Sequence, residues 1–129
     1  MILCILLIAH FLADFTFQTN QLVRRKRSDF KYLIRHAIIY AAIFSISIFP
    51  FIKFGKGIFA LIIITGSHFF IDWARILGDN RLKEAPNLFF TFIADQILHV
   101  LILITLYYVF DLGSAATSIY KSIQQWPYF

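Results

Sequence analysis

Imidazole and carboxylate side chains recur at one spacing inside three apolar segments of this chain. The pairs are His10 with Asp14, His68 with Asp72, and, in reversed order, Asp95 with His99. Residues four positions apart lie on the same face of a helix, so each pair would point in one direction. Neutral imidazole and carboxylate are ligands for zinc, manganese, iron and nickel. The spacing therefore predicts a divalent-metal site whose ligands are these six residues.

The burial of these groups needs an explanation, because three of the seven acidic residues and all four histidines, His36 included, fall within apolar segments. An aspartate near the centre of a membrane helix costs roughly 2.5–3.5 kcal/mol on insertion scales. A bound cation would offset that cost. Seven candidate ligands exceed the four of a mononuclear site, which leaves room for one or two ions. We expect His36 and Asp95 to have catalytic roles, His36 as a general base or an outer ligand.

Further polar residues lie near these pairs. Gln18, Gln96 and Tyr40 are predicted to orient ligands or to bind substrate, although a solvated helix end would also explain Gln18 and aromatic packing would explain Tyr40. Four bases could hold an anionic headgroup, although membrane topology alone also accounts for them. These bases are Arg24, Arg25, Lys26 and Lys31.

The composition shows which kind of protein must position these residues. Of 129 residues, 60% are hydrophobic and only 15% are charged, and sixteen are phenylalanine. A typical soluble domain has about 25% charged residues, and a small domain has too much surface to hide so many apolar side chains. Disordered chains lack such residues, and a single cysteine excludes a disulfide scaffold. The chain is therefore predicted to be an integral membrane protein.

Four apolar segments are long enough to cross a bilayer, which takes about 20 helical residues. They lie near 2–22, 33–52, 57–77 and 87–110. A shorter stretch near 113–126 has helical spacing and aromatic residues suited to a membrane interface. The predicted fold class is all-α: an integral membrane four-helix bundle, forming one domain over residues 1–129, with a short C-terminal interfacial helix.

The distribution of the twelve basic residues predicts the orientation of the bundle. Nine fall in the first and third connections or at the adjoining helix ends, against three on the opposite side. Positive charge concentrates on the cytoplasmic side, so both termini are expected outside. The reversed order in the fourth span then places every aspartate of the three pairs nearer the cytoplasm than its histidine. Basic loops beside membrane helices indicate topology and contact with anionic lipid, so we expect no nucleic-acid partner.

The motifs His10-Phe-Leu-Ala-Asp14-Phe-x-x-Gln18, His36, His68-x-x-Ile-Asp72 and Asp95-Gln96-x-x-His99 carry a resemblance. Together they resemble a bacterial family of small inner-membrane proteins known only as a domain of unknown function. More loosely, the style of motif is similar to that of integral-membrane metal-dependent hydrolases. The resemblance implies a multi-pass protein of the bacterial cytoplasmic membrane.

The leading functional hypothesis is hydrolysis of a membrane-associated ester, phosphoester or amide by a metal-bound water. The substrate would be lipid-like or amphipathic, and an anionic one would suit the basic loops. One alternative is a transporter or relay for metal ions or protons, because intramembrane histidine and aspartate also line ion paths. Another is an accessory membrane protein with a structural metal. A homo-oligomer is compatible with each of these hypotheses.

Overall fold

The computed structural model of the protein describes residues 1–17, 19–82 and 85–125, and this part of the chain is almost entirely helical. The elements are α1 (Ile2–Phe11), a π-helical turn η1 (Leu12–Thr16), α2 (Asn20–Lys26), α3 (Phe30–Ile48), α4 (Phe54–Leu82), α5 (Ala85–Val109) and α6 (Ser118–Gln124). The all-helical prediction is confirmed for these residues.

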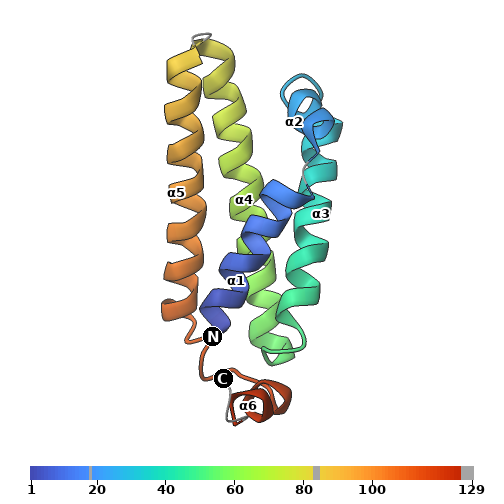
Figure 1. Ribbon diagram of the computed structural model, residues 1–129, viewed down its shortest axis with the longest axis vertical. Coiled ribbons are helices and arrows are strands. Elements are labelled where there is room, and N and C mark those ends of the chain that lie inside the picture. The colour runs from blue at the N-terminus through green and yellow to red at the C-terminus, as the bar shows by residue number, and fades with distance from the viewer. Residues whose placement is uncertain (18, 83–84, 126–129) are drawn as a thin grey trace.

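The long helices lie side by side along the molecule (Figure 1). Helices α4 and α5 pack together, α3 packs against α4, and α1 lies between α3 and α5. Short α2 lies at the same end as the final turn of α4, whereas the N-terminus and α6 lie at the opposite end. The bundle therefore has an α2 end and an N-terminal end.

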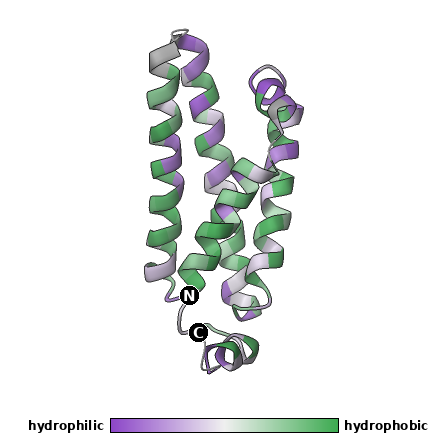
Figure 2. Ribbon diagram, in the orientation of Figure 1, coloured by the Kyte–Doolittle hydropathy of each residue, from purple (hydrophilic) through white to green (hydrophobic). Residues whose placement is uncertain are grey.

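Three helices in the described part of the chain are long and apolar enough to cross a membrane. They are Phe30–Ile48, Phe54–Arg81 and Leu88–Val109. Between 17% and 28% of the residues in their most apolar windows are buried inside the protein, and the others are partly or fully exposed. Hydrophobic residues cover most of these helices, and hydrophilic ones gather at the α2 end (Figure 2). Such a surface suits a lipid surround, because lipid chains solvate apolar side chains.

The first predicted span, 2–22, was wrong as a single helix. Residues Ile2–Thr16 form a shorter apolar helix, about 22 Å long at 1.5 Å per residue, against a hydrocarbon thickness of about 30 Å. Thr19 then has extended backbone, and its side chain accepts a hydrogen bond from the amide of Leu22 at 3.2 Å. This N-cap starts α2 as a separate helix.

The other predicted boundaries shift by several residues. Helix α3 begins at Phe30 because Asp29 caps its first turn, accepting from the amide of Lys31 at 2.9 Å. Helix α4 continues through Gly78, where we expected a break, to Leu82, and α5 begins at Ala85. The C-terminal helix α6 is shorter than predicted, and position 126 lies outside the described residues.

The N-terminal end of the bundle has an apolar core. Its fully buried side chains come from α1, α3, α4 and α5, and they include Leu6, Phe44, Ile48, Ile64 and Leu103. The segment before α6 closes this end. The amide of Lys53 donates to the carbonyl of Ala115 at 2.8 Å, and the amide of Thr117 donates to the carbonyl of Phe51 at 3.0 Å.

Candidate metal centre

Seven imidazole and carboxylate groups meet in the half of the bundle nearer α2. They come from five elements: His10 from α1, Asp14 from η1, His36 from α3, His68 and Asp72 from α4, and Asp95 and His99 from α5. Six of these residues are at most 3% exposed, and the side chain of Asp14 is 6% exposed. The structure thus brings together the three predicted pairs and His36.

Two imidazoles and two carboxylates form the innermost part of this cluster. The Nε2 atoms of His36 and His68 lie 2.9 Å apart. Asp14 Oδ1 is 3.4 Å from His36 Nε2 and 3.6 Å from His68 Nε2. Asp72 Oδ2 is 3.5 Å and 3.9 Å from the same two nitrogens. Each carboxylate thus approaches both imidazoles at once.

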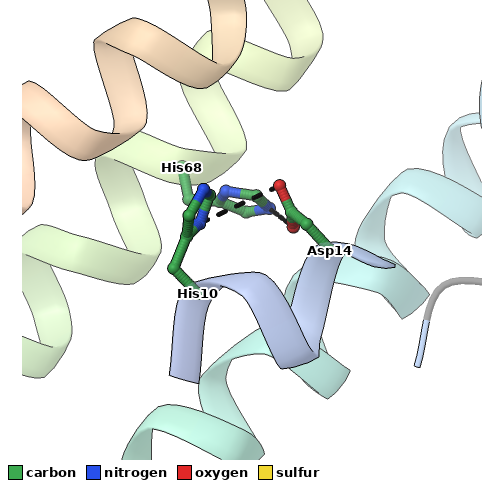
Figure 3. Close-up of side chains that lie close together, drawn as sticks. All are labelled: His10, Asp14 and His68. Carbon is green, nitrogen blue, oxygen red and sulfur yellow. Dashed lines mark ion pairs between the residues drawn. The ribbon is translucent and has the colours of Figure 1, made fainter. Parts of the chain in front are cut away.

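The π-helical turn has a local role in placing Asp14. The amide of Phe17 donates to the carbonyl of Leu12 at 2.9 Å, a bond between residues five apart. This wider turn rotates the residues within it relative to the helix before it, and such turns are frequent at functional sites. In Figure 3, His10, Asp14 and His68 point toward one another, with Asp14 3.9 Å from His10 Nδ1.

His10 and His99 form an outer part of the cluster. The ring of His99 lies 4.4 Å from that of His68 and 5.3 Å from that of His10. His99 Nδ1 is 3.8 Å from Asp95 Oδ2. Among the described residues, the Nε2 atoms of His10 and His99 have no hydrogen-bond partner, although both are buried. Buried polar atoms usually have partners, so these nitrogens are available to a ligand or a proton.

Tyr40 and Gln96, which the sequence analysis predicted to orient ligands or to bind substrate, both contact residues of the cluster. The Tyr40 hydroxyl lies 3.1 Å from His10 Nδ1, and its ring stacks on that of His68 at 3.6 Å. Tyr40 therefore combines packing with a polar contact. The Gln96 amide donates to Asp14 at 3.3 Å and to Asp95 at 3.1 Å, so it connects η1 to α5.

Lys26 departs from the prediction that grouped it with the surface bases. Its side chain is 2% exposed, and its Nζ donates to Asp72 Oδ2 at 2.7 Å. Helix α2 packs against α3, and the Lys26 ammonium at its last residue reaches Asp72 on α4. No spacing rule connects residues 26 and 72, so the sequence offered no signal for this pair.

Arg75 is a second cation that the sequence analysis counted only as a topological charge. Its Nε lies 3.5 Å from Asp95 Oδ1, and its Nη2 lies 3.9 Å from Asp72 Oδ1. Arg75 follows Asp72 by three positions, which places both on one helix face. That spacing could have shown from the sequence that Arg75 lies beside Asp72.

A smaller polar cluster lies closer to α2. Arg27 pairs with Asp79 at 3.1 Å, and Thr91 donates to the other oxygen of Asp79 at 2.5 Å. These contacts join α2, α4 and α5. Asp79 is 5% exposed, and the sequence analysis missed it because it lay beyond the expected end of the third span.

The remaining predicted residues lie apart from the cluster. Arg24, Arg25 and Lys31 are exposed, and Arg25 donates to the hydroxyl of Tyr32. Gln18 lies outside the described residues.

A polar pocket of about 280 Å³ adjoins the cluster. Its charged lining residues are Asp14, Lys26, Arg27, Asp72, Arg75 and Asp95. Three carboxylates and three cations balance in it when the histidines are neutral. A small polar molecule in this pocket would therefore contact both innermost carboxylates and all three cations.

Comparison with known proteins gives one match. The family described as "Protein of unknown function (DUF3307)" matches residues 2–126. Neither the curated proteins nor the solved structures contain a match to the chain.

Proposed function

The chain belongs to the DUF3307 family of proteins of unknown function, and we propose that it is an intramembrane hydrolase that depends on one divalent metal ion. The observation that carries the proposal is the approach of two carboxylates to two imidazole nitrogens in a buried cluster. The substrate is a membrane-associated ester, phosphoester or amide.

The spacing of the innermost atoms supports a four-ligand site. A tetrahedral ion with metal–ligand bonds of about 2.0–2.1 Å has ligand atoms about 3.3 Å apart. Five of the six distances between the proposed ligand atoms are described above, all except the one between the two carboxylates, and they run from 2.9 to 3.9 Å. The proposed ligands are Asp14, His36, His68 and Asp72. His36, which the sequence analysis gave as a general base or an outer ligand, is thus proposed as one of the four ligands.

The position of Arg75 favours a site with one metal ion over a site with two. Asp72, Asp95 and His99 also present ligand atoms within 4.8 Å of one another. The Arg75 guanidinium, however, lies against both of these carboxylates and already supplies their positive charge. A second cation would have to displace it against electrostatic repulsion. His10, Asp95 and His99 are therefore assigned to roles around the ion.

The proposed chemistry uses these surrounding groups. An ion held by these four residues would need to take water as a fifth ligand, and it would then lower the pKa of that water and supply a nucleophile at neutral pH. His99, next to Asp95, is the proposed acceptor of the proton from that water, because its Nε2 has no partner among the described residues. Tyr40 and Gln96 hold His10 and Asp14 in place. Lys26 and Arg75 stabilise negative charge that develops on the substrate.

We propose a membrane arrangement with α3, α4 and α5 as spans and α1 as a shorter fourth helix of the bundle. The α2 end, rich in lysine and arginine, faces the cytoplasm of a bacterial inner membrane, and both termini lie outside. Helix α6 lies at the opposite interface. The apolar core of the N-terminal half argues against a continuous polar path through one copy, which the transporter alternative requires.

Metal content tests the proposal directly. The protein, purified in detergent after growth with zinc, manganese, iron and nickel, is expected to hold about one ion per chain by mass spectrometry. The variants Asp14→Asn and His68→Ala are expected to hold less than about a tenth of that. Asp111→Asn, at an exposed acid outside the cluster, is the matched control.

Turnover separates an enzyme from a protein with a structural metal. Alkyl nitrophenyl phosphate and the matching carboxylate ester serve as chromogenic probes. His99→Ala is expected to retain the ion and the helical circular dichroism while losing about a hundredfold or more in turnover. Absence of metal in the wild-type protein overturns the proposal, and so does full turnover in the presence of a chelator.

A further inference from the structure

A second cavity, apolar and open to the outside, lies between α4 and α5. It has a volume of about 380 Å³. Small residues, Ala74 and Gly78 on α4 and Ala94 on α5, form it, and Phe70 and Leu98 flank it. Between Phe70 and Gly78 the helix rises about 12 Å. In a membrane this groove faces lipid and has the length of a short alkyl segment.

The groove adjoins the polar pocket beside the metal cluster. Arg75 and Asp95 line both of them. This ion pair therefore separates an apolar groove on the lipid side from a pocket that also contains Lys26 and Arg27. A molecule that passed this pair would have one apolar part and one polar part.

Charge identifies the polar part. The pocket has three carboxylates and three cations, so a divalent ion would leave it with a surplus of two positive charges. A phosphate monoester carries about −1.5 to −2 at neutral pH and balances that surplus. The two guanidinium groups, of Arg27 and Arg75, also match phosphate oxygens in geometry.

We propose that the groove and pocket together bind a membrane-embedded, single-chain phosphate amphiphile, an alkyl or prenyl monophosphate. The chain lies between α4 and α5, and the phosphate lies beside Arg75, Arg27 and Lys26. The groove alone, at about 380 Å³, is near the lower end for small-molecule sites, which suits one chain rather than two. This inference rests on the proposed function and specifies its substrate class.

Two glycines of α4 provide a matched pair of variants. A Cβ atom added at Gly78 or at Gly66 meets nothing within 4 Å. Only Gly78 lines the groove. Gly78→Leu therefore adds a side chain at the groove with room for its Cβ atom, and Gly66→Leu places the same side chain elsewhere on the same helix. Replacing glycine inside a helix favours the helix, so both variants should fold.

The probe is dodecyl phosphate with a terminal diazirine, photolysed with the protein in uncharged detergent. Labelled peptides are expected to map to the segments 70–78 and 94–98. Gly78→Leu is expected to lower this labelling by about tenfold or more, and Gly66→Leu to leave it unchanged. Unlabelled dodecyl phosphate should compete, and dodecanol should not. Ala94→Leu provides a second groove variant with the same expected loss.

Several outcomes overturn the inference. They are even labelling over the exposed apolar surface, equal competition by dodecanol, and full labelling of both groove variants. Metal analysis of the same samples keeps the two proposals apart. Labelling of the groove in a protein without metal would contradict the proposed hydrolase alone, whereas a metal-containing, active protein without groove labelling would contradict this inference alone.

Discussion

The two halves of the bundle bury different kinds of side chains. Near the N-terminus the buried residues are apolar, such as Leu6, Phe44 and Leu103, and they pack α1, α3 and α5 together. Near α2 these helices, together with α4, bury four histidines and several carboxylates. Ionisable groups are unfavourable in a membrane, so they need the packing of the other half to hold their helices in place. The comparison suggests a division between a half that provides stability and a half that provides chemistry.

The variant expected to have the largest effect breaks a charge pair in the polar half. Lys26→Met leaves Asp72 without its ammonium partner. Breaking one side of a buried ion pair costs about 3–5 kcal/mol. We expect that loss in the free energy of unfolding, measured in detergent with chelator present. Added zinc should recover part of it, because an ion on Asp72 would replace the missing positive charge.

Lys31→Met is the control for this variant, because Lys31 is exposed and its removal should change stability by less than about 0.5 kcal/mol. Equal losses at positions 26 and 31 would mean that the buried pair contributes nothing. Equal losses with and without zinc would mean that no ion binds Asp72.

The variant with the next largest expected effect removes a buried side chain from the apolar half. Leu103 is 1% exposed, and Leu103→Ala should lower the free energy of unfolding by about 3 kcal/mol, through lost contacts and a cavity. The metal content per folded chain should stay unchanged, because the ligands lie in the other half. Leu101→Ala, on the exposed side of the same helix, should have little effect on either measurement. A Leu103→Ala protein that folds but loses its metal would contradict the division between the halves.

The sequence could predict the cluster but not all of its contents. Its helix-spaced pairs and their reversed order in the fourth span were local patterns, so the convergence of His10, Asp72 and Asp95 could be read from them. Lys26 could not, because its place depends on the break at Thr19 that starts α2 as a separate helix. The four polar residues at 18–21 interrupt the apolar pattern there, but they do not say in which direction the next helix runs. The length of the apolar segments therefore predicted the helix boundaries less well than the spacing of the polar residues predicted the cluster.

A smaller effect tests the boundary between the two halves, where Tyr40 stacks on both Phe44 and His68. Tyr40→Phe keeps the ring and removes the hydroxyl that contacts His10 Nδ1. A neutral hydrogen bond contributes about 1 kcal/mol, and groups that orient a metal site change its affinity by about 10–100-fold. We expect a small loss of stability with a clear loss of zinc affinity, measured by competition with a chelating dye.

Tyr120→Phe is the matched control, because Tyr120 is a buried tyrosine of the apolar half. It should leave zinc affinity unchanged. If the two tyrosine variants behaved alike, Tyr40 would belong to the packing of the apolar half alone.

The smallest expected effect concerns the outer edge of the polar half, where Arg27 pairs with Asp79. The Arg27 side chain is 36% exposed, and pairs in contact with water contribute about 0–1 kcal/mol. Arg27→Gln should therefore lower the free energy of unfolding by about 0.5 kcal/mol at low salt, and by less at high salt because ions screen the pair. Arg24→Gln, at an exposed base, is the control and should show neither change. A loss at Arg27 as large as that of Lys26→Met, independent of salt, would extend the buried polar half to the end of α2. The contrast between Lys26, the last residue of α2, and Arg27, which follows it, thus measures where burial by the bundle stops and solvent begins.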